Sequence, residues 1–503
     1  SDILYVQNWY GVDMRPDQWA LGAWSESTGY PSVLEIHDGR LCAGNSPTEP
    51  TTIHFSQIGG FNLTSSSWAT VDIDGQVYND FGFNVGIAGG NQSPIQWISS
   101  SSDGVLVGTY NSEGIVGAND TSEGFSPGNV TYRKSTSVGS KSIQPVMIDQ
   151  STLFISRTGR RLHELTYNLA SGGQKSPDLT LLAEHVTLTG VIDFAWQSEP
   201  LSTLWLVLSD GKLVGFTFDQ NNEISAWHQH NIAGEDDSTY SSGLGSAESM
   251  VRSVAVIPAT DGLSDEVWIF VDREASSINY GAPTTRSQDF KSISGTIEVL
   301  SPIFSDQDDI KDSRHLDSFL SISSAIVSKT TSDTSGTVAG LTEGSIYLLT
   351  NTVTSGTLNI DTDNQYFLVD GGKFKSTAGS VIDFGATFTA DTQITSTTFT
   401  GLDIMLGKTI RVYADGRDLG TQVINPVVGV VTLDNGAYGA NVTFGYDYTS
   451  YVELQNLEGG SIQNLNQGKT KRLKAVMVRL VDSLGLKYGK SSTDMYEYYF
   501  DED

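Results

Sequence analysis

Two histidines separated by one residue are the clearest candidates for metal chemistry in this sequence. His228 and His230 lie in the segment Trp227-His228-Gln229-His230, and alternate residues of a β-strand point to the same face. Imidazole nitrogens are common zinc ligands, but a zinc site needs further ligands. None of the remaining candidates shows ligand spacing: Cys42, His37, His54, His163, His185 and His315. We therefore favour ordinary packing or surface histidines over a metal site.

Two other segments resemble ion-binding loops. Asp361-Thr362-Asp363-Asn364 has the alternating oxygen ligands of a calcium loop, but the glycine and the closing glutamate of an EF-hand are not at their positions. Gly485-Leu486-Lys487-Tyr488-Gly489-Lys490-Ser491 ends like a phosphate-binding loop, yet it is one residue short of the G-x-x-x-x-G-K-S pattern. We expect a surface turn at the first segment and no phosphate site at the second.

The motifs of common hydrolases are missing from the sequence. It contains neither H-E-x-x-H nor G-x-S-x-G, which leaves a zinc protease and an α/β-hydrolase without support. Paired carboxylates for glycoside cleavage stay open, because their separation is a tertiary property and 59 acidic residues offer many pairs. Trp97, Trp196, Trp205, Trp227 and Trp268 could stack on sugars, but packing between strands is the simpler explanation. We predict no enzyme and no catalytic, cofactor-binding or metal-binding residues.

Strand pairs joined by tight turns recur along the first 300 residues. They lie at residues 33–44, 97–108, 146–165, 194–218 and 254–271. The clearest copy runs from Leu204 to Phe216, where Asp210-Gly211 separates two strand-like runs, a strong hairpin signal. A period of about 50 to 60 residues is typical of sheets arranged radially in a β-propeller, and it is too long for a heptad or a helical solenoid.

Composition supports a β protein and argues against a nucleic-acid clamp. The 503 residues include 52 Gly, 20 Tyr, 20 Phe and 9 Trp, which suit turns and pleated, half-buried surfaces. The net charge of −30 opposes tight binding to phosphates, which depends on Lys and Arg. The same acidity would suit a surface past which DNA must slide, although solubility alone also explains it.

Cysteine content and hydropathy indicate a soluble chain that folds in a cytoplasm. The single Cys42 excludes an internal disulfide framework, and we expect a buried, inert thiol. No run of about 18 apolar residues exists, so we predict no membrane-spanning segment. The first residues, Ser1-Asp2-Ile3-Leu4-Tyr5, lack the basic and apolar regions of a signal peptide.

The predicted fold is all-β, a β-propeller with inserted small β-barrel or sandwich domains. Residues 1–320 form most of the propeller, and near their end they include a charged connector at 306–312. Residues 321–400, rich in Ser and Thr, form an inserted β domain, and residues 401–465 form a small barrel with strands at 409–413 and 427–433. Residues 466–503 are predicted as return strands that complete the propeller, because 473–480 alternates with period two.

An ordered series of residues resembles the tail nozzle proteins of short-tailed bacteriophages, also called tail tubular protein B. These landmark residues are Gly29-Tyr30-Pro31, Gly39-Arg40-Leu41, Gly108-Thr109 with Glu113, Gly159-Arg160-Arg161-Leu162-His163-Glu164-Leu165, Asp178-Leu179-Thr180 with Ala183-Glu184-His185, Trp196-Gln197-Ser198-Glu199-Pro200, Leu204-Trp205 with Asp210-Gly211, Trp227 with His230, Ser253-Val254-Ala255-Val256-Ile257-Pro258, Asp265-Glu266-Val267-Trp268, Ile297-Glu298-Val299-Leu300, Leu316-Asp317-Ser318, Gly401-Leu402-Asp403 with Leu406-Gly407-Lys408, Ala414-Asp415-Gly416 and Val478-Arg479-Leu480-Val481-Asp482-Ser483. Relative to that family, residues 321–397 look like an insertion.

The resemblance implies a structural virion protein that needs no cofactor. It implies a homo-oligomeric ring, expected to be a hexamer, that docks on a tail adaptor and portal and contacts tail fibres. Phage DNA would pass through its lumen without specific binding. The expected location is the virion tail, assembled in the host cytoplasm. Two alternatives stay open: a tail-tip propeller that binds or degrades host polysaccharide, and a cellular propeller that serves as an interaction module.

Overall fold

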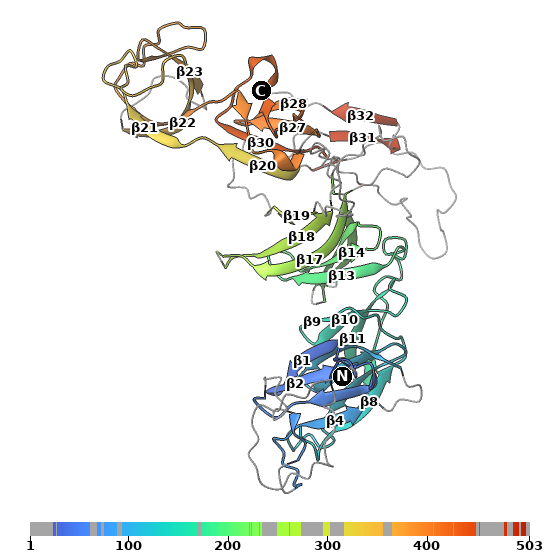
Figure 1. Ribbon diagram of the computed structural model, residues 1–503. Helices are drawn as coiled ribbons and strands as arrows, with labels where there is room; N and C mark the ends of the chain where they lie inside the picture. Colours follow the sequence, from blue (N-terminus) through green and yellow to red (C-terminus); the bar gives the residue numbers. More distant parts are fainter. Residues whose placement is uncertain are drawn as a thin grey trace, which may run out of the picture. The chain divides into compact units, whose positions relative to one another are not determined.

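The computed structural model describes most of the chain as β-strands and tight turns (Figure 1). The described residues are 24–26, 28–60, 68–71, 75–87, 93–168, 173–220, 222, 224–230, 232–233, 249–260, 262–272, 295–301, 316–355, 365–405, 407–425, 427–448, 452, 477–479, 486–491 and 494–498. No α-helix occurs among them, which confirms the all-β prediction. The chain divides into two compact units, Ser1–His230 with Met250–Val271, and Asn231–Ser249 with Asp272–Asp503.

The first unit contains four consecutive four-stranded antiparallel meanders, which we call blades 1 to 4. Blade 1 holds β1 (Val33–His37), β2 (Arg40–Gly44), β3 (Thr52–Phe55) and β4 (Phe83–Gly86), and blade 2 holds β5 (Ile95–Ser101), β6 (Gly104–Thr109), β7 (Glu113–Gly117) and β8 (Thr131–Thr136). Blade 3 holds β9 (Val146–Ile148), β10 (Ser151–Ile155), β11 (Leu162–Asn168) and β12 (Gly173–Lys175), and blade 4 holds β13 (Val191–Gln197), β14 (Thr203–Leu208), β15 (Leu213–Asp219) and β16 (Ile224–His230). β17 (Met250–Pro258) and β18 (Asp265–Asp272) pair next along the chain.

The predicted hairpins are confirmed, and their turns show why the residues suit them. Asp38 and Gly39 join β1 to β2 with φ of 45° and 70°, the left-handed pair that a tight hairpin turn requires. The turn between β14 and β15 is longer than the expected two residues. It spans Ser209 to Lys212, with Gly211 at φ 85°.

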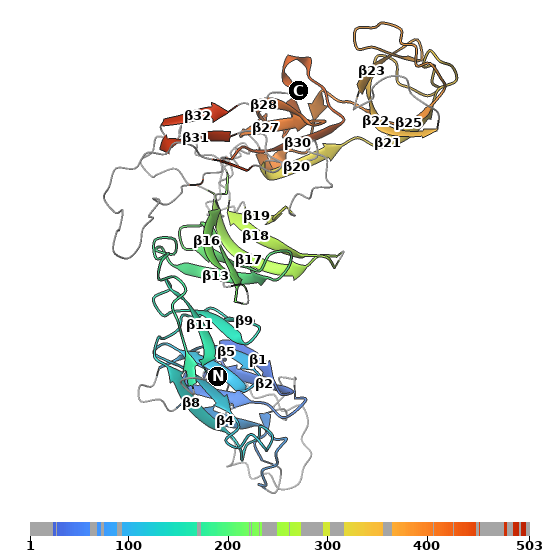
Figure 2. The same cartoon turned by 180° about the vertical axis from the view of Figure 1, so that it is seen from behind.

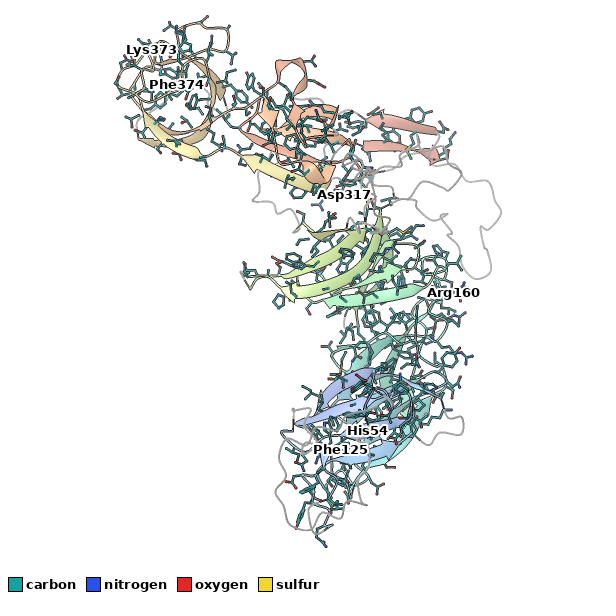
Figure 3. The ribbon with its side chains drawn as sticks, in the orientation of Figure 1. His54, Phe125, Arg160, Asp317, Lys373 and Phe374 are labelled. Atoms are coloured by element: carbon teal, nitrogen blue, oxygen red, sulfur yellow. The ribbon has the colours of Figure 1, made fainter. Side chains whose placement is uncertain are left out.

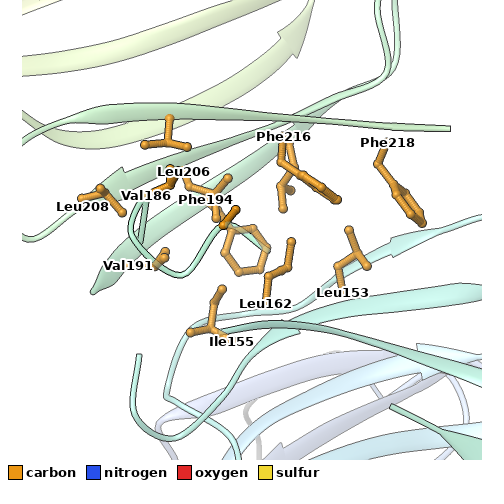
Figure 4. Close-up of a cluster of buried hydrophobic side chains, with 13 residues drawn as sticks. Leu153, Ile155, Leu162, Val186, Val191, Phe194, Leu206, Leu208, Phe216 and Phe218 are labelled. Atoms are coloured by element: carbon orange, nitrogen blue, oxygen red, sulfur yellow. The ribbon is translucent and has the colours of Figure 1, made fainter. Parts of the chain in front are cut away.

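Each blade packs its apolar face on the next blade in the series. Phe55 of blade 1 and Val105 of blade 2 belong to one buried cluster, and Trp97 of blade 2 contacts Phe154 of blade 3 at a ring distance of 5.7 Å. The interface between blades 3 and 4 is the largest, and Figure 4 shows its facing side chains. It contains Leu153, Ile155, Leu162, Val191, Phe194, Leu204, Leu206, Leu208, Val214, Phe216 and Phe218.

This serial packing of meanders is the arrangement of β-propeller blades, as predicted. Burying a Leu or Phe side chain contributes about 1.5 to 3 kcal/mol, so each interface is a substantial source of stability. Closure of the blades into a ring stays a prediction.

The second unit combines a four-stranded sheet, which we call the barrel sheet after the predicted domain, with an inserted sheet. Closure of the barrel sheet stays a prediction. The barrel sheet runs in the order β20 (Asp317–Ser323), β30 (Asn441–Tyr446), β27 (Thr409–Ala414), β28 (Arg417–Val423), beside the pair β26 (Thr398–Phe399) and β29 (Val431–Thr432). The inserted sheet runs β21 (Ile326–Thr330), β25 (Thr389–Ile394), β22 (Ile346–Ser355), β23 (Gln365–Asp370), β24 (Lys373–Lys375). Lys373 and Phe374 lie on this inserted sheet (Figure 3). β19 (Gly295–Val299) precedes both sheets along the chain.

The inserted sheet leaves the barrel and returns to it at adjacent points. The amide of Ser324 donates to Ala440 O and the amide of Ser396 donates to Gly439 O, both at 2.9 Å. The two sheets also have separate cores, one around Phe384 and one around Phe444. The barrel therefore begins at Asp317, before the insertion, whereas the sequence placed its start at 401.

One predicted strand differs from the structure. Of residues 427–433, only Val431 and Thr432 form a strand, and Val427 and Val428 are exposed. The cause is a turn at Gly429, which has φ of 50° and lies against the backbone of Asp403.

The predicted return strands are described only in part. Most of 473–480 lies outside the described residues, and Met477 and Val478 are exposed outside any strand. β31 (Leu486–Ser491) and β32 (Asp494–Tyr498) form a two-stranded sheet of their own.

Candidate functional site

The two histidines singled out in the sequence both belong to β16, the edge strand of blade 4. Figure 2 labels this strand. Nδ1 of His228 lies 2.6 Å from Nε2 of His230. The prediction that alternate residues bring both rings to one face is therefore confirmed. Both side chains are half-buried.

Two neighbouring strands hold the rings in place. Trp205 of β14, Gly215 of β15 and His228 of β16 form one row across the sheet. A Cβ at Gly215 would lie 1.9 Å from Cε1 of His228, so the ring lies directly over this glycine. Thr217 Oγ1 is 3.1 Å from the outer nitrogen of the same ring, Nε2. Trp205 packs against His230 with ring centres 4.9 Å apart.

The surroundings of both rings favour the neutral imidazole. Burial lowers the pKa of His228, and burial together with the neighbouring His228 lowers the pKa of His230 to about 4. Neutral imidazoles keep a lone pair for a metal ion. Among the described residues, no group of three or more His, Cys, Asp or Glu side chains is placed to hold a metal.

Of the two segments that resemble ion-binding loops, only one lies within the described residues. Residues 361–364 lie outside the described residues. The segment that resembles a phosphate-binding loop forms β31, an extended strand that pairs antiparallel with β32. A phosphate-binding loop instead wraps its amides around the anion before a helix. Cys42 is fully buried, and burial raises the pKa of its thiol to about 12. This confirms the expected buried thiol.

The tryptophans lie where the packing explanation places them. Trp97 is fully buried and lies over Gly108, whose Cβ position is 2.1 Å from the indole. Nε1 of Trp205 donates to Gln197 Oε1 at 2.9 Å, and Nε1 of Trp227 donates to Leu179 O at 3.1 Å. Trp196 packs at the rim of the interface between blades 3 and 4. In β18, Nε1 of Trp268 donates to Glu266 Oε2.

A surface depression on blade 1 was missed in the sequence. It has a volume of about 690 Å³ and is lined by Thr48, Glu49, Pro50, Thr51, Thr52, Asn84 and Pro94. The buried ring of His54 (Figure 3) connects two of these residues. Its Nδ1 is 2.9 Å from Asn84 Oδ1, and its Nε2 is 3.2 Å from Glu49 Oε2. No local motif signals this group, because only the pairing of β3 with β4 brings Asn84 to His54.

Two buried charged groups in the blades bond to the backbone and to hydroxyls. Arg40 is fully buried and donates to the carbonyl oxygens of Ser56, Phe81 and Asn79 at 2.5 to 2.7 Å. Fully buried Glu113 accepts hydrogen bonds from several donors, namely the hydroxyls of Thr136 and Ser140 and the amide of Val138. Both groups are explained by a structural role, because most of their hydrogen-bonding capacity is used within the fold, although Nε of Arg40 has no partner among the described residues.

A polar joint connects the inserted sheet to the barrel within the second unit. The hydroxyl of Tyr366 donates to Asp415 Oδ2 at 2.6 Å, and the guanidinium of Arg417 lies 4.6 Å from the Tyr366 ring. Asp415 also accepts from the amides of Ala440 and Asn441. Burial, followed by the Asp415 carboxylate, raises the pKa of Tyr366.

Comparisons with known proteins give little. No protein-family model and no curated protein matches the chain. Three solved structures cover 48% of this chain. They are an auxiliary nutrient binding protein from Bacteroides thetaiotaomicron (9% identity, 52% of that chain, TM-score 0.27), the β-propeller domain of Cps50 (Swd1) from Myceliophteria thermophila (11%, 80%, 0.25) and a luciferin-regenerating enzyme (11%, 84%, 0.18). Such low TM-scores carry no argument about function.

In the described part of the chain, no helix is long and apolar enough to cross a membrane.

Proposed function

We propose that this protein is a structural subunit of the distal tail tube, the nozzle, of a short-tailed bacteriophage. In this role, copies of the chain assemble into a ring, expected to be a hexamer, below a tail adaptor and portal. The genome leaves the capsid through the lumen of that ring. Equivalent subunits joined head to tail close into a ring when the rotation between them closes.

The observation that carries this proposal is that landmark residues far apart in the sequence bond to one another. Asp265 accepts hydrogen bonds from the amides of Ser198 and Glu199, at 2.8 and 3.1 Å. The guanidinium of Arg161 is 3.3 Å from Asp178 and 2.6 Å from Glu184. These contacts give the landmark residues a structural role in the fold, which is what a scaffold protein requires.

The landmark residues support a scaffold more than a catalyst. Arg40 and Glu113 are buried and hydrogen-bonded, and Gly39 and Gly211 occupy left-handed turn positions. These residues hold strands and turns in place and line no reaction cleft. The net charge of −30 suits a conduit, since phosphates are repelled by an acidic wall and find few cations to bind.

Electron microscopy of the purified protein and of the virion tests the proposal. We expect a closed ring at the distal end of the tail, with density for the second unit in every subunit. The same ring should be missing from particles made without this gene, which should carry capsid and portal only. Finding the protein solely inside the capsid, or in no particle, would contradict the proposal.

The depression on blade 1 favours one alternative, a tail-tip protein that binds or degrades host polysaccharide. Its hydroxyl, carboxylate and amide groups are of the kinds that contact sugars. Incubation with host envelope glycans, read as retained ligand and released reducing ends, tests this. Glu49→Gln and Asn84→Ala should abolish the signal, and Glu123→Gln, an exposed acid, should not. Wild-type protein that neither retains nor cleaves any glycan would end this alternative.

A further inference from the structure

We propose that His228 and His230 form a two-nitrogen chelate for a square-planar transition-metal ion, with Cu²⁺ as the preferred occupant. The inference is independent of the proposed function. It rests on two imidazole nitrogens from one strand that lie 2.6 Å apart and share one hydrogen bond.

The spacing of the two nitrogens selects the geometry of the metal. With metal–nitrogen bonds of about 2.0 Å, two adjacent ligands lie about 2.8 Å apart in a square-planar site and about 3.3 Å apart in a tetrahedral one. The observed 2.6 Å is the length of the hydrogen bond between the rings, so the two nitrogens must separate for either geometry, and by less for the square-planar one. A small rotation of the two rings then admits Cu²⁺, whereas Zn²⁺ in its tetrahedral geometry requires a larger separation. Cu²⁺ is also the strongest divalent binder of the first transition row for such ligands.

The surroundings of His228 fix the orientation of its ring, so that Nδ1, the inner nitrogen, faces His230. His228 lies over Gly215, where any side chain would occupy the place of the ring. Its Nε2 is 3.1 Å from Thr217 Oγ1, so the ring can keep its proton on Nε2 and donate it to the hydroxyl. That tautomer leaves Nδ1 free for the metal. Hydrogen bonds of this kind commonly orient metal-binding histidines.

No proton has to leave the protein when the metal binds. Each neutral imidazole carries one proton, and in the bound form these protons lie on Nε2 of His228 and Nδ1 of His230. In the free protein one inner nitrogen carries the proton of the hydrogen bond between the rings. When the metal binds, this proton moves to the outer nitrogen of the same ring, and the two inner lone pairs replace two waters of the aqueous metal ion. The remaining ligand positions fall to water, because among the described residues no third His, Cys, Asp or Glu is placed to bind.

Titration of the full chain with Cu²⁺, followed by calorimetry and electron paramagnetic resonance, tests the proposal. We expect one tight site whose spectrum is that of square-planar Cu²⁺ with splitting from two nitrogens. His228→Gln and His230→Gln should each weaken binding at least about tenfold and reduce the splitting to one nitrogen. His185→Gln, an exposed histidine in a loop, is the matched control and should leave both readouts unchanged.

Thermal unfolding followed by circular dichroism checks that each variant is folded. The proposal is overturned if the spectrum is unchanged in the folded double variant His228→Gln/His230→Gln, because the copper would then be bound elsewhere. It is also overturned if Zn²⁺ binds to the wild-type pair more tightly than Cu²⁺, since that order requires a different geometry.

Discussion

At the scale of single residues, the fold depends on polar side chains that are buried with their partners. Arg40 shows this most clearly, because one guanidinium satisfies three backbone carbonyls of blade 1 and lies 5.2 Å from the ring of Phe83. A planar group with several donors can bridge carbonyls that point from different directions. A lysine at this position would carry a compact charge and would leave some of the three carbonyls without a donor.

We therefore expect Arg40→Lys to destabilise the first unit by about 2 kcal/mol, since each buried carbonyl left without a donor costs about 1 to 3 kcal/mol. Urea unfolding followed by tryptophan fluorescence measures the change. Arg157→Lys makes the same substitution at an exposed arginine and should change stability by less than about 0.5 kcal/mol. Equal effects of the two substitutions would show that the carbonyl contacts are unimportant.

The histidine pair predicts a loss of stability in mild acid. The pKa of His230 in the folded protein is about 4, below the ordinary 6.5. Between these two pH values the unfolded chain binds a proton at this histidine and the folded chain does not. Stability should therefore fall as the pH drops from about 6.5 toward 4. With metal removed by a chelator, wild type should lose about 1 kcal/mol more than His230→Gln between pH 7 and 5. Identical pH profiles in urea unfolding would refute this.

At the scale of elements, glycines inside strands decide how closely side chains and backbones approach. Gly108 in β6 accommodates the indole of Trp97, whereas Gly86 in β4 has open space at its Cβ position. Gly108→Ala should cost about 1 to 3 kcal/mol, because the buried indole must move. Gly86→Ala should be neutral or slightly stabilising. Thermal unfolding of the two variants gives the comparison, and a neutral Gly108→Ala would contradict the packing described for blade 2.

The inserted sheet should be removable without unfolding the barrel. Its ends lie together on Gly439 and Ala440, and its core is separate from the core around Phe444. Replacing residues 325–395 with a short Gly-Ser linker should leave a cooperative unfolding transition and a protease-resistant second unit. Removal of β30 is the matched control and should abolish both, because this strand pairs with β20 and β27. A deletion variant that is digested as readily as the control would contradict independent folding.

Local features could be predicted from the sequence, and long-range ones could not. The turn at Asp38-Gly39 and the hairpin around Gly211 depend on backbone preferences that neighbouring residues express. The depression near His54 depends on which strands pair, and the start of the barrel at Asp317 depends on the pairing of β20 with β30. The prediction of a strand at 427–433 was wrong. The apolar run favours a strand, but Gly429 forms a turn that interrupts it.

At the scale of the whole molecule, net charge makes the sharpest prediction. A chain with 59 acidic and 29 basic residues should bind duplex DNA weakly even at low salt, where electrostatic attraction is strongest. Fluorescence anisotropy with a labelled duplex at about 50 mM salt should detect no binding at micromolar protein. Salt-sensitive, tight binding would instead show a concentrated basic surface and would argue against a lumen past which DNA slides.

The adjacent exit and re-entry points of the inserted sheet have a genetic consequence. A crossover at the codons for Ser324 and Ser396 would replace one complete folded module by another and leave every pairing of the barrel sheet intact. Recombination between related genomes could therefore exchange this segment as a cassette. Homologues should then differ most in length and composition between these two positions, while the flanking strands diverge slowly.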